Sequence, residues 1–78
     1  MSWITEDNKL KKEFKFRDFS EAFAFLTRVA IEAEKMNHHP EIYNVYNQVK
    51  IALQTHDAGN IITDKDHQLA KAIDQLIE

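Results

Sequence analysis

Hydrophobic and polar residues alternate along two stretches of the chain, residues 3–17 and residues 41–55. Alternation of this kind is typical of half-buried β-strands, so each stretch is predicted to form a β-hairpin. Asp7-Asn8 and Tyr46-Asn47 are the predicted turns, because Asp and Asn tolerate left-handed backbone angles. The apolar positions of one parity are Leu10, Phe14 and Phe16 in the first hairpin, and Tyr43, Val45, Val49, Ile51 and Leu53 in the second, where Lys50, Ala52 and Gln54 sit opposite.

Two details of the first hairpin can be predicted further. Trp3 and Ile4 precede the turn and are expected to belong to a short first strand. Lys12 falls among the apolar positions of the second strand, which predicts a strand end or a bulge nearby.

A period of three to four residues predicts a helix from about residue 19 to residue 36 or 37. Asp18 precedes it and Glu21 follows three residues later, an Asp version of the capping box. Pro40 bars helical geometry at the residue before it, so the helix ends upstream of that point. The apolar stripe of this helix comprises Phe19, Ala22, Phe23, Leu26, Val29, Ala30 and Ala33.

The same period predicts a second helix near the end of the sequence. Thr63 and Asp66 have the spacing of a capping box at its start. His67 lies off its apolar stripe and is therefore expected at the surface. The stripe comprises Leu69, Ala70, Ile73, Leu76 and Ile77.

The predicted order is strand, strand, helix, strand, strand, helix. Two hairpins and two helices fit a single α+β domain over residues 1–78, with a four-stranded antiparallel sheet and both helices on one face. The other face is either solvated or used for association.

Composition narrows the class of protein. A core built from 78 residues without cysteine is marginal, so additional burial by self-association is expected. The net charge is -3 and the short basic cluster at residues 9–17 is predicted to be a solvated strand face, which argues against direct nucleic-acid binding. The sequence contains no apolar run that could span a membrane, and its first residues do not resemble a signal peptide, so a cytoplasmic location is expected.

Histidine is the residue type with the clearest chemical potential, because imidazole takes up and releases protons near neutral pH. His38 and His39 lie in the connection between a helix and the sheet. Pro40 forces an extended backbone at His39, and side chains of consecutive extended residues point in different directions. The pair can therefore flank a planar ligand, or it can be a polar connection without a role. A metal site made of His38, His39 and His56 is conceivable, but the adjacent pair argues against it and no metal is predicted.

His56 closes the run Gln54-Thr55-His56-Asp57, where a strand ends in a loop, and loop edges often carry catalytic residues. The alternative is a strand-end histidine capped by Asp57. Glu34 precedes His38 by four residues and could orient or charge a histidine, or be solvated.

These residues resemble a known family. The runs Glu34-Lys35-Met36-Asn37-His38-His39-Pro40-Glu41 and Thr55-His56-Asp57 look like the signature of the pterin-4a-carbinolamine dehydratases, and the resemblance extends from about residue 10 to the end. It implies a four-stranded α+β domain that forms dimers or tetramers. It also implies dehydration of 4a-hydroxytetrahydropterin to quinonoid dihydropterin, a step in the recycling of a tetrahydropterin cofactor. The pterin is the substrate, and no separate cofactor is implied.

The resemblance also implies roles for single residues. His38 and His56 match the acid and base of the family, without an indication of which is which. His39 matches the residue that binds and positions the pterin, and Glu34 matches a supporting carboxylate. The implied substrate-binding set is Asn37, His38, His39, Pro40, Gln54, Thr55, His56 and Asp57.

This sequence departs from the family pattern at three places. The family often has a helix before the first hairpin, whereas this sequence begins almost at the hairpin, which implies a different assembly surface. Asn37 stands where an acidic residue is common. The loop at residues 58–63 is one residue longer than the family's, and because that loop borders the site in the family, the natural pterin stays open.

Two alternatives follow from the same resemblance. One is a dimerisation or coactivator module that binds a protein such as a transcription factor, supported by Phe25 and Ile31 off the stripe of the first helix. The other is a protein that handles a related pterin such as molybdopterin.

Overall fold

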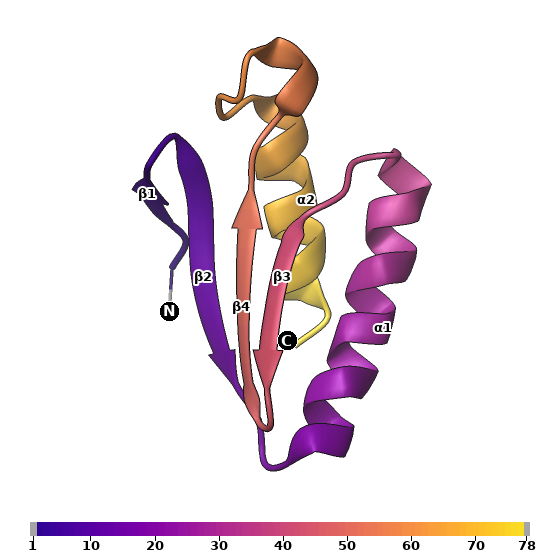
Figure 1. Ribbon diagram of the computed structural model, residues 1–78. Helices are drawn as coiled ribbons and strands as arrows, with labels where there is room; N and C mark the ends of the chain where they lie inside the picture. The colour runs from indigo at the N-terminus through magenta and orange to yellow at the C-terminus, as the bar shows by residue number, and fades with distance from the viewer. Residues whose placement is uncertain (1, 78) are drawn as a thin grey trace.

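The computed structural model describes residues 2–77, so Met1 and Glu78 of the predicted domain lie outside the described residues. A four-stranded antiparallel sheet has the order β1-β2-β4-β3, and helices α1 and α2 lie on one side of it (Figure 1). The predicted α+β architecture is confirmed. The elements are β1 (Ile4–Glu6), β2 (Lys9–Lys15), α1 (Phe19–Met36), β3 (Glu41–Val45), β4 (Gln48–Leu53), the 3₁₀ turn η1 (His56–Ala58) and α2 (Asp64–Gln75).

Both hairpin turns form where the sequence predicts them. Asp7 and Asn8 have φ values of 55° and 59°, and Tyr46 has a φ of 49°, so the left-handed backbone falls at the predicted positions. The first strand is shorter than predicted, because Trp3 precedes it.

The turn at Tyr46-Asn47 reverses the parity of the second hairpin. Its register pairs Asn44 with Val49 and Tyr43 with Lys50, so an odd position of β3 lies opposite an even position of β4. Residues directly opposite in a ladder point to the same face. Tyr43 therefore does not share a face with Val49, and the grouping by parity was wrong across the turn.

Lys12 neither ends a strand nor marks a bulge, contrary to the prediction. The register of β2 on β4 continues without interruption from Leu10 to Lys15. Lys12 points to the helix side of the sheet, where its Nζ lies 2.7 Å from Oδ1 of Asp74 on α2. Its side chain is only 8% exposed, and Nζ lies 5.8 Å from the ring centroid of Trp3 and 5.2 Å from that of Phe14. The apolar face accepts this lysine because α2 supplies a carboxylate.

Helix α1 begins and ends as predicted but buries a different face. The Asp18 side chain accepts a hydrogen bond from the Glu21 backbone, and Asn37 closes the helix in a left-handed conformation. Phe25, predicted off the apolar stripe, is 5% exposed, and its ring centroid lies 4.9 Å from that of Phe14 in β2 and 4.9 Å from that of Phe16 directly after β2. Phe23, predicted in the core, is 54% exposed. Phe19 and Ala30 were likewise expected inside and are exposed, and the buried residues are Ala22, Phe25, Leu26, Val29 and Ala33.

Helix α2 begins with the predicted capping box between Thr63 and Asp66. Leu69, Ala70 and Ile73 are buried as expected. Ile77 lies beyond the end of the helix and is 47% exposed, so its prediction as part of the stripe was wrong. His67 is exposed, as predicted.

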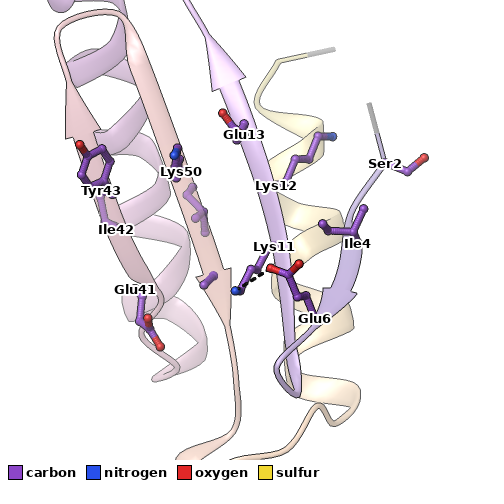
Figure 2. Close-up of a pocket in the computed structure, with 12 residues that line it drawn as sticks. Ser2, Ile4, Glu6, Lys11, Lys12, Glu13, Glu41, Ile42, Tyr43 and Lys50 are labelled. Atoms are coloured by element: carbon purple, nitrogen blue, oxygen red, sulfur yellow. Dashed lines mark hydrogen bonds and ion pairs between the residues drawn. The ribbon is translucent and has the colours of Figure 1, made fainter.

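The face of the sheet opposite the helices is uncovered and holds a cavity of about 580 Å³ (Figure 2). Lys11 extends across this face to an ion pair with Glu6 at 3.0 Å, and Tyr43 and Lys50 line the cavity from β3 and β4. None of the histidines lines it. Within residues 2–77, neither helix is long and apolar enough to cross a membrane.

Candidate functional site

Two connections meet at one end of the sheet. Glu41, the first residue of β3, pairs with Ala52 near the end of β4. The connection that precedes β3 and the segment that follows β4 therefore lie at the same end, beside the start of α2 (Figure 1). The first connection carries His38 and His39, and the second carries His56.

His38 points into the molecule and is 8% exposed. Its Nε2 lies 2.6 Å from Oδ1 of Asp66, and this carboxylate is fully buried. The other carboxylate oxygen accepts hydrogen bonds from the Thr55 hydroxyl at 2.7 Å and from the Thr63 backbone N–H at 2.9 Å. These four residues, which we call the Asp66 network, join the connection before β3, the end of β4 and the first turn of α2.

The network keeps Asp66 ionised. Burial raises the pKa of this carboxyl. The hydrogen bonds from His38, the Thr63 backbone and Thr55 lower the pKa by more than burial raises it, so it lies below its usual value. An ionised carboxylate can only accept, so His38 carries hydrogen on Nε2 and leaves Nδ1 for another partner. Asp66 therefore fixes the orientation of the His38 ring.

His39 points outward and His38 inward, so the two side chains point in different directions, as predicted. Nε2 of His39 contacts Oε2 of Glu34 in the last turns of α1, and both side chains are exposed. Glu34 thus supports His39, whereas its sequence position left open which histidine it would serve. Asn37 turns the chain with a φ of 48°, and Pro40 is half-buried.

His56 is the first residue of η1 and is exposed. Its Nδ1 lies 2.8 Å from Oδ1 of Asn60, so its partner is Asn60 and not Asp57. Gln54 donates from its amide to the Asn60 carbonyl at 3.0 Å, which fixes the loop against the end of β4.

Comparison with known proteins identifies the family. The family described as Pterin 4 alpha carbinolamine dehydratase matches residues 1–76. The chain belongs to the pterin-4a-carbinolamine dehydratase family. Membership places it among the lyases that dehydrate a pterin.

Curated relatives agree with this assignment. A protein of Prochlorococcus marinus (strain NATL2A), provisionally named pterin-4-alpha-carbinolamine dehydratase, is 55% identical over 97% of this chain and 79% of its own length. A protein of Synechococcus sp. (strain WH7803) with the same provisional name is 57% identical over 95% of this chain and 78% of its own length.

Solved structures share the fold. A protein from Brucella melitensis, described as a transcriptional coactivator/pterin dehydratase, is 38% identical with a TM-score of 0.93, over 99% of this chain and 83% of that one. A pterin dehydratase-like protein identified as a RuBisCO assembly factor in the alpha-carboxysome is 26% identical with a TM-score of 0.82, over 97% of this chain and 89% of that one.

Each of the three candidate histidines has its own partner. The structure brings His38 and Thr55 together on Asp66, pairs His39 with Glu34 and pairs His56 with Asn60. Within residues 2–77, no group of three or more His, Cys, Asp or Glu side chains is arranged to hold a metal ion.

Sequence reasoning missed the roles of Asp66 and Asn60. Asp66 was recognised as a helix-capping residue, and that spacing gave no sign of its contact with His38, 28 positions away. Asn60 lies in the loop between η1 and α2. An Asn four residues after a candidate histidine was the available signal.

Proposed function

We propose that this protein catalyses the dehydration of 4a-hydroxytetrahydropterin to quinonoid dihydropterin and water, in the recycling of a tetrahydropterin cofactor. The observation that supports it best is the placement of three histidines at one end of the sheet, each with one ring nitrogen held by a polar partner. A fixed ring nitrogen orients the other one, and proton transfer depends on such positioning.

The reaction requires two proton transfers. A proton leaves a nitrogen of the pterin ring, the bond from C4a to its hydroxyl oxygen breaks, and that oxygen takes up a proton and departs as water. His38 and His56 are the proposed acid and base, since a group that titrates near neutrality can do either task. His39, supported by Glu34, is proposed to bind and position the pterin.

The remaining predicted binding residues take different parts in this proposal. The Thr55 hydroxyl bonds Asp66 and lies 2.5 Å from that of Thr63, so Thr55 acts by holding the Asp66 network. Asn37, Pro40, Gln54 and Asp57 shape the two connections around the pterin.

The proposal is tested with purified protein and 4a-hydroxytetrahydropterin, made chemically or by an aromatic amino acid hydroxylase. We expect H56A to lower kcat by about a hundredfold or more, the usual contribution of a general acid or base. The control H67A replaces the exposed histidine of α2 and should leave the rate unchanged. A parent protein that does not accelerate dehydration would refute the proposal.

His38 needs a second variant, because H38A leaves a buried carboxylate without its partner and lowers stability. The amide of H38Q can still donate to Asp66 but cannot transfer a proton. We expect H38Q to melt close to the parent and to lose activity by about the same factor as H56A. A folded H38Q with parental kcat would remove His38 from the mechanism.

Self-association as a homodimer or homotetramer is part of the proposal. Phe19, Phe23 and Ile31 are about half exposed on α1, and the rings of Phe19 and Phe23 contact each other at an interplanar angle of 38° with centroids 5.5 Å apart. A second copy of the chain is the proposed occupant of this face, since a domain of this size gains stability from such burial. Phe25 is buried and contributes nothing to an outer surface, so the coactivator alternative keeps only Ile31 of its two supporting residues.

A further inference from the structure

The partners of the three histidines differ in charge. His38 and His39 each face a carboxylate, whereas His56 faces the neutral side chain of Asn60. We propose that Asn60 is a positioning residue that fixes the hydrogen of the His56 ring on Nδ1, so that His56 Nε2 is the base of the reaction. This inference rests on the proposed function.

The contact fixes which nitrogen carries the hydrogen. The Asn60 atom that lies 2.8 Å from His56 Nδ1 is Oδ1, and an amide oxygen can only accept. Nδ1 therefore donates, and in a neutral ring the lone pair lies on Nε2. A histidine side chain free in water favours the other arrangement, so the protein selects the form that presents Nε2 as an acceptor.

The backbone around Asn60 is held from several directions. Its N–H donates to the Thr55 carbonyl at 3.2 Å, and its own carbonyl accepts from the Gln54 amide at 3.0 Å. The following residue, Ile61, accepts from the Thr55 N–H at 2.8 Å. Asn60 has a φ of 61°, a left-handed conformation that Gly and Asn adopt more readily than most residues. Asn is thus a residue that fits the backbone and also supplies an acceptor for His56.

The hydrogen bonds of His56 and His38 assign the two proton transfers of the reaction. The pterin ring nitrogen gives its proton to His56 Nε2, and the resulting imidazolium still donates from Nδ1 to Asn60. The Asp66 carboxylate accepts from Nε2 of His38, so the ring keeps this hydrogen bond while its Nδ1 carries a proton into the reaction. His38 delivers this proton to the leaving hydroxyl, which departs as water, and both histidines return to their starting forms by exchange with solvent.

The first test reads the hydrogen position directly by long-range proton–nitrogen NMR of the folded protein. We expect His56 to carry hydrogen on Nδ1 in the parent and mainly on Nε2 in N60G, a substitution that fits the left-handed backbone. The matched control is N8G, which makes the same change at Asn8, where φ is 59° in the turn between β1 and β2. A parental His56 with hydrogen on Nε2, or a hydrogen position unchanged in N60G, would overturn the inference.

The second test reads the consequence for catalysis. We expect kcat of N60G to fall about fivefold, the order of one hydrogen bond, with KM within about twofold and N8G at the parental rate. A shift of the hydrogen in N60G without a change in kcat would overturn the catalytic role of Asn60. If H56A is fully active, the proposed function of His56 fails whatever the hydrogen position in the parent.

A third test, with the variant N60D, distinguishes whether His56 is the base or the acid of the reaction. The carboxylate of this variant accepts from Nδ1 as Asn does but stabilises the imidazolium, so the unprotonated base appears only at higher pH. We expect N60D to keep hydrogen on Nδ1 and to move the acidic limb of the pH profile of kcat upward. A shift of the alkaline limb alone would make His56 the acid and refute the assignment.

Discussion

Two oxygen atoms of Asp66 receive hydrogen bonds from a histidine ring, a threonine hydroxyl and a backbone amide. A fully buried carboxylate is costly to desolvate, and it persists as an anion only when its lone pairs are satisfied. The Asp66 network meets this condition with donors from three segments of the chain. The same hydrogen bonds therefore stabilise the fold and fix the ring of His38.

The pH dependence of stability should reveal this carboxylate. Because the pKa of Asp66 in the folded protein lies below the usual 3.8, the unfolded chain takes up this proton first as the pH falls. The contribution of Asp66 is thus complete above that value and is lost as the pH drops through the folded pKa. We expect D66N to be less stable by about 1–3 kcal/mol near neutral pH.

Urea unfolding between about pH 5 and pH 2 measures the effect, since the difference between two variants isolates one group. The stability of D66N should fall less steeply with decreasing pH than that of the parent. D64N, which changes an exposed carboxylate in the same helical turn, is the control and should follow the parent. Parallel curves for D66N and the parent would contradict the prediction.

At the scale of elements, the carboxylate of Asp74 connects α2 to the first hairpin through hydrogen bonds. Asp74 accepts hydrogen bonds from the Trp3 indole N–H at 3.1 Å and from Lys12 Nζ at 2.7 Å. The two contacts join the segment before β1, the strand β2 and the last turns of α2. Lys12 is nearly buried, so it depends on this partner more than a surface lysine would.

D74A should therefore destabilise the protein by about 1–3 kcal/mol, because it leaves the Lys12 ammonium buried without its carboxylate. K12M, which removes the buried charge itself, should cost less than D74A. The control K35A breaks the exposed pair with Glu32 and should change the free energy of unfolding by less than about 1 kcal/mol. Chemical denaturation of the four proteins gives the comparison, and a D74A variant as stable as K35A would refute it.

Local pattern predicted the elements and both turns, because periodicity and left-handed positions are properties of neighbouring residues. It failed where the outcome depended on partners distant in sequence. The choice between Phe23 and Phe25 for the core depends on where the sheet aromatics lie, and Lys12 is accommodated by a residue 62 positions away. Parity failed at Tyr43 because a two-residue turn exchanges odd and even positions between paired strands.

The candidate site likewise contains residues that could be predicted from the sequence and contacts that could not. His38, His39 and His56 could be selected by residue type and by resemblance to a family. Asp66 could not be assigned to them, because its contacts span 28 positions to His38 and 11 to Thr55. The pairing of Glu34 with His39 also required the direction in which each ring points.

At the scale of the whole molecule, apolar side chains remain exposed on both outer surfaces. Phe19, Phe23 and Ile31 lie on α1, and Ile4 and Tyr43 lie on the uncovered face of the sheet. Single exposed apolar residues are ordinary on a protein surface. The contact between the exposed rings of Phe19 and Phe23 makes α1 the stronger candidate for contact between copies.

The assembly prediction is tested by sedimentation velocity of the parent and of F23S. We expect the parent to sediment as a dimer or tetramer and F23S to shift toward the monomer, with secondary structure retained. F25A is the contrasting variant, because it empties a core position and should cost about 3–5 kcal/mol of stability. A monomeric parent, or an F23S assembly identical to the parental one, would show that this face is not the interface.

Asp66 both stabilises the fold and orients His38, and this combination affects which residues can change as the family diverges. A descendant that no longer needs the reaction could lose the exposed His56 and Asn60 by drift with little harm to its fold. Loss of Asp66 would lower the stability of the fold, since that carboxylate accepts hydrogen bonds from three segments. Among distant relatives, Asp66 should therefore outlast the chemistry, and the retention of His56 is the better sign that a homologue still turns over a substrate.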